Sequence, residues 1–192
     1  PMSRDRIFDF IGGDEVNSSP SHAPHRKVIN VSDLTEESLQ LHYPDIEQII
    51  REKVKPLRDE LGPNPVNRPL KKRWWAYQAH RPELYQRILS LREVIVIPRV
   101  SAHLNCAIVP SNLIYSDQLV VFASSSLSLF AVLQSRVHSI WAKFNSSSQG
   151  DGLRYSPTDC FETFPFPPQI IESVELADIG RAYIDFRRSL MA

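Results

Sequence analysis

The sequence predicts an α+β fold, with a mostly antiparallel sheet and an amphipathic helix packed on it. Four short segments rich in Val and Ile lie between residues 93 and 123, and their connections are too short for parallel crossovers. A serine-capped apolar pattern over residues 124–144 predicts the packed helix. A further helical pattern runs from Ile171 to Leu190 and predicts a C-terminal helix.

The four predicted strands are the segments EVIVIPR, LNCAIV, NLIYS and QLVVFA. Each is bounded by Pro, Ser, Asn or Asp, as antiparallel hairpins require. The turn between the first two strands carries Ser101, His103 and Asn105, whose side chains can all form hydrogen bonds at a predicted hairpin tip. Cys106, within the second strand, should be a small core residue.

The packed helix should contact the sheet through one apolar stripe. This stripe consists of Phe130, Leu133, Val137, Trp141 and Phe144. His138 falls on the polar side of the same helix, so we expect it to face solvent. The loop NSSSQGDG, residues 145–152, follows the helix and is rich in hydrogen-bond donors and acceptors.

An arm and a linker are predicted to precede the sheet. Residues 1–32 look mostly extended, and a helical pattern from Pro44 to Leu61 should kink or break at Pro56. Residues 62–69, GPNPVNRP, are typical of a loop, and residues 71–91 should form one interrupted helix or two short ones, the second starting at Pro82. We therefore divide the chain into an arm and linker (1–69), a main domain (70–168) and a C-terminal helical region (169–192).

The composition indicates a soluble globular protein. No run of about 18 apolar residues is present to span a membrane, and the first ten residues lack the hydrophobic region of a signal peptide. Cys106 and Cys160 lie in unlike contexts, which fits free thiols in a reducing compartment. We expect a cytoplasmic protein, and because the last helical pattern is still periodic at the final residues, a fragment of a longer one.

The net charge of zero hides a strongly basic segment. Residues 50–100 contain 12 Lys and Arg against 5 Asp and Glu, a net charge of +7, interleaved with Trp74, Trp75, Tyr77 and Tyr85. Such a mixture is typical of surfaces that bind a phosphate backbone, although a solvated helix face explains the charge equally well. At least one of the two tryptophans should be a packing residue. The candidate backbone-contacting residues are Lys71, Lys72, Arg73, Arg99 and Lys143.

No catalytic site is evident in the sequence. It has no glycine-rich phosphate loop, metal quartet, nucleophile elbow or nuclease-like acidic pair with a supporting lysine. His22 and His25 form an HxxH pair without a second ligand pair. A hydrolase using His103 or His138 would need a partnered nucleophile that we do not find. We assign no catalytic, metal-binding or cofactor-binding residue.

A proline-rich connector, RYSPTDCFETFPFP, spans Arg154 to Pro167. Its prolines exclude a regular helix or a central strand through its tail, because each fixes φ and lacks a backbone donor. The connector lies between the strand-rich block and the last helical pattern. It is therefore a candidate boundary or ligand-facing loop.

Several segments, in this order, resemble the target-recognition region of single-chain type IIL or type IIG (MmeI-like) restriction-modification enzymes. They are FIGGDEVN, RKVINV, YPDIEQIIREKVKPLRD, RWWAYQAHRPELY, the strand block, LQSRVHSIWA and RYSPTDCFETFPFP. In such enzymes a recognition domain, an adenine-N6 methyltransferase and a nuclease share one polypeptide. The same layout occurs in phage-defence methyltransferases without a nuclease, so the resemblance fits a parent protein with or without endonuclease activity.

The resemblance implies that the loop before the Arg-Tyr pair reads bases. The corresponding residues here are Gln149, Gly150, Asp151, Gly152, Arg154 and Tyr155, and the two glycines offer no reading side chain. Arg can donate two hydrogen bonds to guanine, whereas Asp can accept one from cytosine, so Arg154 and Asp151 are the better candidates. We add Ser101, His103 and Asn105 as base-reading candidates. A salt bridge from Arg154 to Asp159 or Glu162 is the alternative for that arginine.

We therefore expect a module that reads a short duplex DNA sequence for a methyltransferase domain located upstream in the same polypeptide. S-adenosylmethionine, and Mg²⁺ for any nuclease, would bind to the parent protein and not to this fragment, which should be inactive alone. The alternative is a protein-docking module in which Trp74, Trp75 and the FPFP tail form the contact surface. A DNA-reading module should bind duplex DNA with an affinity that falls steeply with salt, whereas a docking module should show little of either.

Overall fold

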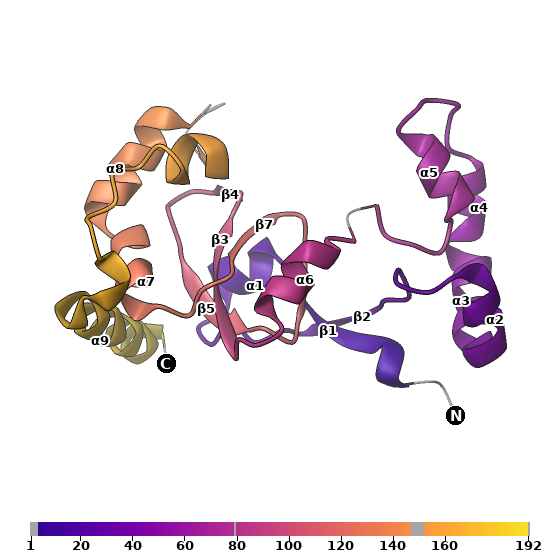
Figure 1. Cartoon of the computed structure of the whole chain (residues 1–192), viewed down its shortest axis with the longest axis horizontal. Helices are drawn as coiled ribbons and strands as arrows, with labels where there is room; N and C mark the ends of the chain where they lie inside the picture. Colours follow the sequence, from indigo (N-terminus) through magenta and orange to yellow (C-terminus); the bar gives the residue numbers. More distant parts are fainter. Residues whose placement is uncertain (1–3, 79, 147–151, 192) are drawn as a thin grey trace. The chain divides into compact units, whose positions relative to one another are not determined.

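The computed structural model describes residues 4–78, 80–146 and 152–191 and divides the chain into two compact units (Figure 1). One unit consists of Pro1–Asp9 and Lys27–Pro82, and the other of Phe10–Arg26 and Glu83–Ala192. The predicted boundary at residue 69 does not coincide with this division, because residues 10–26 belong to the second unit and residues 70–82 to the first. No helix of the described residues is long and apolar enough to cross a membrane.

The first unit is mainly helical. After the short η1 (Arg4–Arg6), β1 (Ile7–Ile11) and β2 (Arg26–Ile29), its helices are α2 (Glu36–His42), α3 (Pro44–Lys53), α4 (Lys55–Asp59) and α5 (Asn67–Lys72). Pro44 occupies the first turn of α3, and the helix ends at Lys53, before Pro56 can remove an internal hydrogen bond. The predicted break is confirmed.

Both tryptophans of the first unit are packing residues. Trp74 is buried with Leu39, Ile46 and Ile50, and its indole N–H donates to Glu36 Oε1 at 3.1 Å. Trp75 packs against the same cluster and donates to the Leu34 carbonyl at 3.0 Å. The segment that carries them is not helical, since α5 ends at Lys72. As predicted, the next helix, α6 (Pro82–Ile88), begins at Pro82.

The second unit is built on the predicted strand block. The central strand β3 (Glu93–Pro98) pairs antiparallel with β5 (Ala107–Pro110) and with β7 (Leu119–Phe122). The strand β6 (Ile114–Tyr115) departs from the prediction, because it pairs in parallel with the end of β1. A two-stranded antiparallel ribbon forms from β4 (Val100–Ser101) and β8 (Leu153–Arg154), and α1 (Gly13–Ser18) follows β1.

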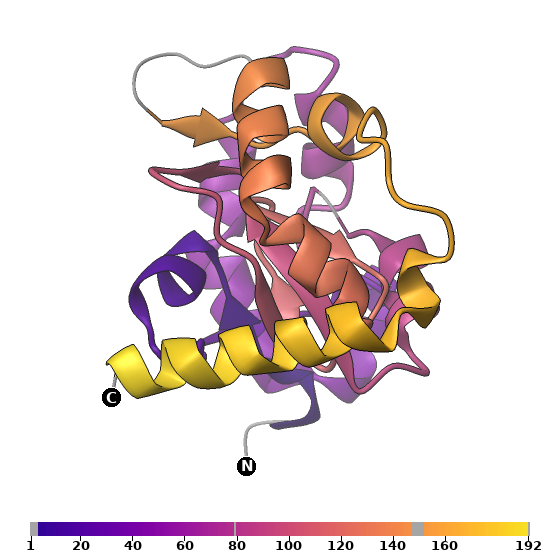
Figure 2. The same cartoon turned by 90° about the vertical axis from the view of Figure 1, so that its left-hand side faces the viewer.

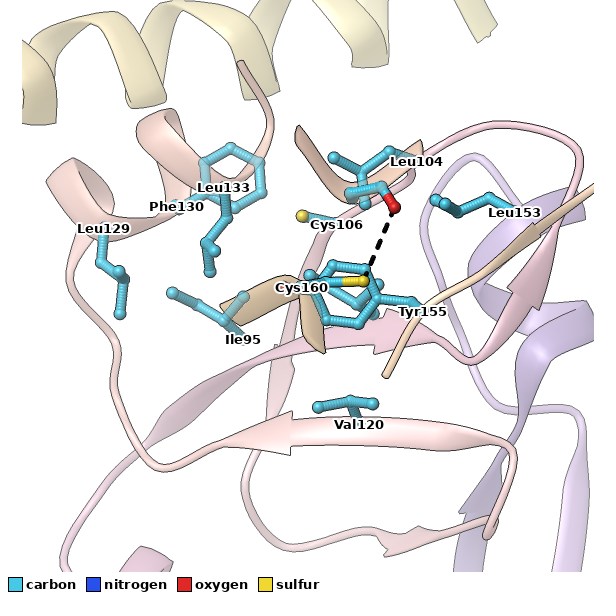
Figure 3. Packing of buried hydrophobic residues seen from close by; sticks show 12 residues of the cluster. Ile95, Leu104, Cys106, Val120, Leu129, Phe130, Leu133, Leu153, Tyr155 and Cys160 are labelled. Atoms are coloured by element: carbon cyan, nitrogen blue, oxygen red, sulfur yellow. Dashed lines mark hydrogen bonds between the residues drawn. The ribbon is translucent and has the colours of Figure 1, made fainter. Parts of the chain in front are cut away.

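Strand β3 separates two hydrophobic clusters. Ile95 and Ile97 belong to one cluster and Val94 and Val96 to the other, because successive side chains of a strand point to opposite faces. Both faces are covered, so the strand is a nearly continuous apolar run. Cys106 and Cys160 are buried free thiols of the first of these clusters, and Figure 3 shows both beside Tyr155.

The predicted packed helix is in fact two helices, α7 (Leu127–Leu133) and α8 (Arg136–Asn145). Ser135 caps α8 by accepting from the His138 backbone N–H, which restarts the helical phase. The predicted stripe is therefore wrong at Val137 and Phe144, which are 68% and 86% exposed, whereas Trp141 is half-buried and packs on Phe164. His138, expected to face solvent, is fully buried.

The connector after β8 is a packed brace. A π-helical turn (Pro157–Phe161) buries Cys160, and the Phe166 ring contacts those of Phe161 and Phe164, each at a centroid distance of 4.9 Å. After η3 (Ile170–Glu172) the chain forms α9 (Val174–Met191), which lies across α7 (Figure 2). A Cβ at Gly180 would meet the Leu127 carbonyl oxygen at 2.5 Å, so the two helices touch backbone to backbone there.

Candidate nucleic-acid interface

The ribbon β4–β8 determines which side of the connector faces solvent. Val100 pairs with Arg154 and Ser101 with Leu153, and the Tyr155 N–H donates to the Arg99 carbonyl at 2.8 Å. Because strand side chains alternate, Leu153 and Tyr155 enter the core while Arg154 is exposed. Figure 3 shows Leu153 and Tyr155 within the buried cluster.

Arg154 lies at a cavity of about 550 Å³, which we call the β8 cavity. Four segments that are distant in sequence meet at it: α1, the β3–β4 corner, the β6–β7 turn and β8. The lining residues are Gly13, Asp14, Asn17, Arg99, Val100, Asp117, Gln118, Gly152, Leu153 and Arg154. The cavity thus offers two guanidinium groups, two carboxamides and two carboxylates, the side-chain types that pair with base edges.

The two arginines of the β8 cavity differ in how they are held. Arg99 donates from Nε to the Asp117 carbonyl at 2.9 Å, and its own N–H donates to the Gln118 carbonyl at 2.7 Å. Arg154 forms no ion pair with any described residue, so the alternative of a salt bridge to Asp159 or Glu162 is not realised. Among the described residues, its guanidinium also has no hydrogen-bond partner.

Helix α1 is anchored by an ion pair whose carboxylate is buried. The Glu15 carboxylate, whose side chain is fully buried, accepts from Arg26 Nε and Nη2, both at 2.8 Å, and from the Gly12 N–H at 2.9 Å. The hydrogen bonds from Arg26 lower the pKa of Glu15 to about 2 despite its burial. This anchor fixes the neighbouring Asp14 and Asn17 at the β8 cavity. Neither they nor Gln118 was predicted, because an isolated polar residue in a turn carries no local signal of its distant neighbours.

Tyr155 is corrected as a base-reading candidate. Its side chain is 1% exposed, and its hydroxyl lies 2.9 Å from His138 Nε2. Burial raises the pKa of Tyr155 and lowers that of His138 to about 4, so the pair is neutral near pH 7. The rings of Phe164 and Phe166 complete the surroundings of the imidazole. Tyr155 therefore supports Arg154 from the core side of β8. Its hydroxyl is already hydrogen-bonded to His138.

The hairpin-tip candidates lie outside the lining of the β8 cavity. Ser101 Oγ donates to the His103 carbonyl, and Asn105 Nδ2 donates to the Val16 carbonyl at 2.9 Å, which ties the end of α1 to the strand block. The side chain of His103 is exposed. Two further candidates, Gln149 and Asp151, lie outside the described residues, as does Gly150.

The predicted backbone-contacting residues fall in both units. In the first unit, Lys71 Nζ donates to the Asp59 carbonyl at 3.0 Å, and Arg73 donates to the Ser32 carbonyl at 2.6 Å while lying over the Trp75 ring. Lys72 is exposed. In the second unit, Lys143 is exposed on α8, and Arg99 belongs to the β8 cavity rather than to a separate surface.

Within the described part of the chain, no group of three or more His, Cys, Asp or Glu residues is placed to hold a metal ion. His25 Nδ1 instead lies 3.3 Å from Glu15 Oε1, beside the ion pair of Glu15 with Arg26. The surface features are those of a binding module: an exposed arginine and two carboxamides lie around one cavity.

Comparison with known proteins identifies that module. The family described as "MmeI, target recognition domain" matches residues 1–168, and the chain belongs to it. The match includes the segment predicted to be an arm and linker. The chain is thus a target-recognition domain of the MmeI family.

A solved structure shares the fold. The type IIL restriction-modification enzyme MmeI in complex with DNA superimposes with a TM-score of 0.76 at 19% sequence identity. The likeness covers 97% of this chain and 24% of that chain, so the present sequence spans about a quarter of the length of that enzyme. No curated protein matches the chain in sequence.

Proposed function

We propose that the β8 cavity is the surface through which this domain reads its DNA target, with Arg154 as a base-reading residue. One observation carries the proposal: Arg154 is exposed, without an ion pair among the described residues, at a cavity that also presents Asn17 and Gln118. Arg pairs bidentately with guanine O6 and N7, and carboxamides pair with adenine N6 and N7. Each such pair discriminates against a wrong base by about 1–3 kcal/mol.

The wider reaction belongs to the parent protein. We propose that a methyltransferase region in the same polypeptide uses S-adenosylmethionine to methylate adenine-N6 in the sequence read here, the target base being extruded from the duplex. A nuclease that uses Mg²⁺ would be a further region of such a parent. The 192-residue chain alone should transfer no methyl group from S-adenosylmethionine to DNA, and detectable transfer would refute this assignment.

Burial of the aromatic residues argues against the docking module. Trp74 is 4% exposed, and Trp75 is half-buried against the same cluster and donates its indole N–H internally, so little of either side chain is offered to a partner. Phe164 of the FPFP tail is 9% exposed and packs on Trp141. The aromatic residues of the predicted docking surface pack inside their own units, the tryptophans in the first unit and Phe164 in the second.

The test is selection of bound sequences from a random duplex library, with wild-type protein and two variants. Arg154→Ala should relax the preference at one base pair, whereas Lys71→Ala/Lys72→Ala should weaken binding to all sequences and leave the preference unchanged. Circular dichroism checks that the variants fold. If the Arg154 variant selects the same sequences with the same stringency as wild type, Arg154 is not a base-reading residue.

A further inference from the structure

A second cavity of the second unit is rich in arginine. It has a volume of about 580 Å³ and lies between α9, the loop after α1 and the segment before β3; we call it the α9 cavity. Arg92, Arg181, Arg187 and Arg188 line it, together with the carboxylates Glu93 and Asp185. Arginines therefore exceed carboxylates by two. Nothing in the proposed function uses these residues, and the helix that carries three of them lies outside the region matched by the family.

The arginines of the α9 cavity differ in the hydrogen bonds and ion pairs that they form. Arg187 Nη1 donates to the Pro20 carbonyl at 2.8 Å, which ties α9 to the loop after α1. Arg188 approaches Asp185 only at 3.9 Å, with both side chains mostly exposed. The side chains of Arg92 and Arg181 form no hydrogen bond or ion pair within the described ranges. Arg181 and Arg188 are seven residues apart on α9, so they project from the same side of the helix.

The charges of these arginines act on a side chain that lines the cavity. His22, which lines it, has its pKa lowered to about 4, first by burial and then by the charges of Arg187 and Arg188. The imidazole is therefore neutral near pH 7, and the local charge excess stays with the guanidinium groups. Such an excess favours a polyanion, and Arg is suited to phosphate oxygens by its planar set of donors.

The α9 cavity adjoins the β8 cavity along the chain. Asn17 lines the β8 cavity and Pro20 lines the α9 cavity, and three residues of chain span at most about 11 Å. Phosphates of one DNA strand recur about every 3.4 Å along the duplex axis. Lining residues of the two cavities are therefore close enough for one duplex to reach both, with bases at the first cavity and phosphates at the second.

We propose that Arg181 and Arg188 of α9, together with Arg92, contact the phosphate backbone of the duplex whose bases face the β8 cavity. The proposal rests on the proposed function and extends it, since it assigns α9 to DNA binding. These contacts supply affinity and register without sequence information. Arg187 positions the loop after α1 and is not needed as a phosphate contact.

The experiment measures duplex binding by fluorescence anisotropy across a salt titration, using a selected target duplex and a duplex of random sequence. Arg181→Ala/Arg188→Ala should weaken binding to both duplexes by the same factor. It should also make the slope of log affinity against log salt shallower by about 0.9 for each phosphate that is no longer neutralised. Arg181→Lys/Arg188→Lys should keep most of the slope, because a lysine still supplies the charge, whereas a packing role would not be rescued.

The matched control is Arg87→Ala/Arg136→Ala, which removes the same charge from exposed positions outside both cavities. Its slope should equal that of wild type. The proposal is overturned if the α9 variant matches wild type, if it and the control lose affinity equally, or if the α9 variant changes sequence preference. It is also overturned if inorganic phosphate raises the melting temperature in an Arg181- and Arg188-dependent way while duplex binding is unchanged. Wild-type protein that binds neither duplex would instead refute the proposed function itself.

Discussion

Two polar pairs support elements that line the β8 cavity, and they differ in charge and in burial. Glu15 and Arg26 form an ion pair beneath Asp14 and Asn17, with Glu15 fully buried and Arg26 44% exposed. His138 and Tyr155 form a neutral pair behind Arg154, and both side chains are buried. The comparison shows that a surface residue can be positioned equally well by charge neutralisation or by a neutral hydrogen bond. The two solutions respond differently to acid.

The largest expected effect is the acid sensitivity of the neutral pair. The folded-state pKa of His138 is about 4, below the ordinary value of 6.5, so the unfolded chain binds a proton that the folded chain does not. Stability conferred by neutral His138 is present above pH 6.5 and is lost as the pH falls toward 4, by roughly 3 kcal/mol. Urea denaturation at a series of pH values measures the loss.

The control for this effect is His138→Gln, which retains a hydrogen-bonding group but does not titrate. Its free energy of unfolding should change less between pH 6.5 and 4 than that of wild type. Equal slopes in the two proteins would show that another group is responsible.

The next effect breaks the charged pair. Glu15→Gln should lower the free energy of unfolding by about 2 kcal/mol at pH 7, because it removes charge-assisted hydrogen bonds from Arg26 while leaving Arg26 partly hydrated. Since the pKa of Glu15 is lowered to about 2, its contribution is present above pH 4.5 and is lost only toward pH 2. Wild type and the variant should therefore converge in stability at that acid limit, as followed by circular dichroism.

A smaller effect is expected from Tyr155→Phe. The substitution preserves the ring in the core but leaves His138 Nε2 without its partner, which costs about 1 kcal/mol. The melting temperature measures the cost. If Tyr155 instead read a base, the variant would change the selected DNA sequence, and that outcome would contradict its role as a support.

The smallest effect on stability is expected at Gly152. A Cβ there would lie 3.6 Å from the Ser101 carbonyl oxygen, an ordinary contact, so Gly152→Ala should change the free energy of unfolding by less than about 0.5 kcal/mol. Because Gly152 lines the β8 cavity, the added methyl group should alter sequence preference. Gly180→Ala is the contrasting control. It should lower the free energy of unfolding, because the added carbon meets the Leu127 carbonyl oxygen at 2.5 Å.

Local patterns in the sequence were sufficient for much of the fold. The strand block, the break at Pro56 and the start of α6 at Pro82 each follow from residues close together in the chain. Local patterns did not predict which face of α8 is buried. Ser135 caps a new helix within a segment whose apolar residues fit one continuous helical period. Burial of His138 and exposure of Val137 are both consequences of that one cap.

The candidate site was less accessible from the sequence. Arg154 was predicted through the family resemblance, and strand alternation then explains why its neighbour Tyr155 is internal. The charge-dense run at residues 71–73 predicts contacts with DNA phosphates, yet Lys71 and Arg73 donate to carbonyls of their own unit. Asn17 and Gln118 meet Arg154 only through long-range topology, including the parallel pairing of β1 with β6. No local pattern encodes that meeting.

The close approach of Gly180 to Leu127 limits the rotation of α9 about its own axis. With no side chain between the two backbones, any roll of α9 would move the neighbouring residues into the Leu127 carbonyl. Gly180, which has no side chain, therefore sets the direction in which the next residue, Arg181, projects from the helix. Because Arg188 lies seven residues further along the same helix, the single hydrogen atom at Gly180 fixes the direction in which both guanidinium groups point.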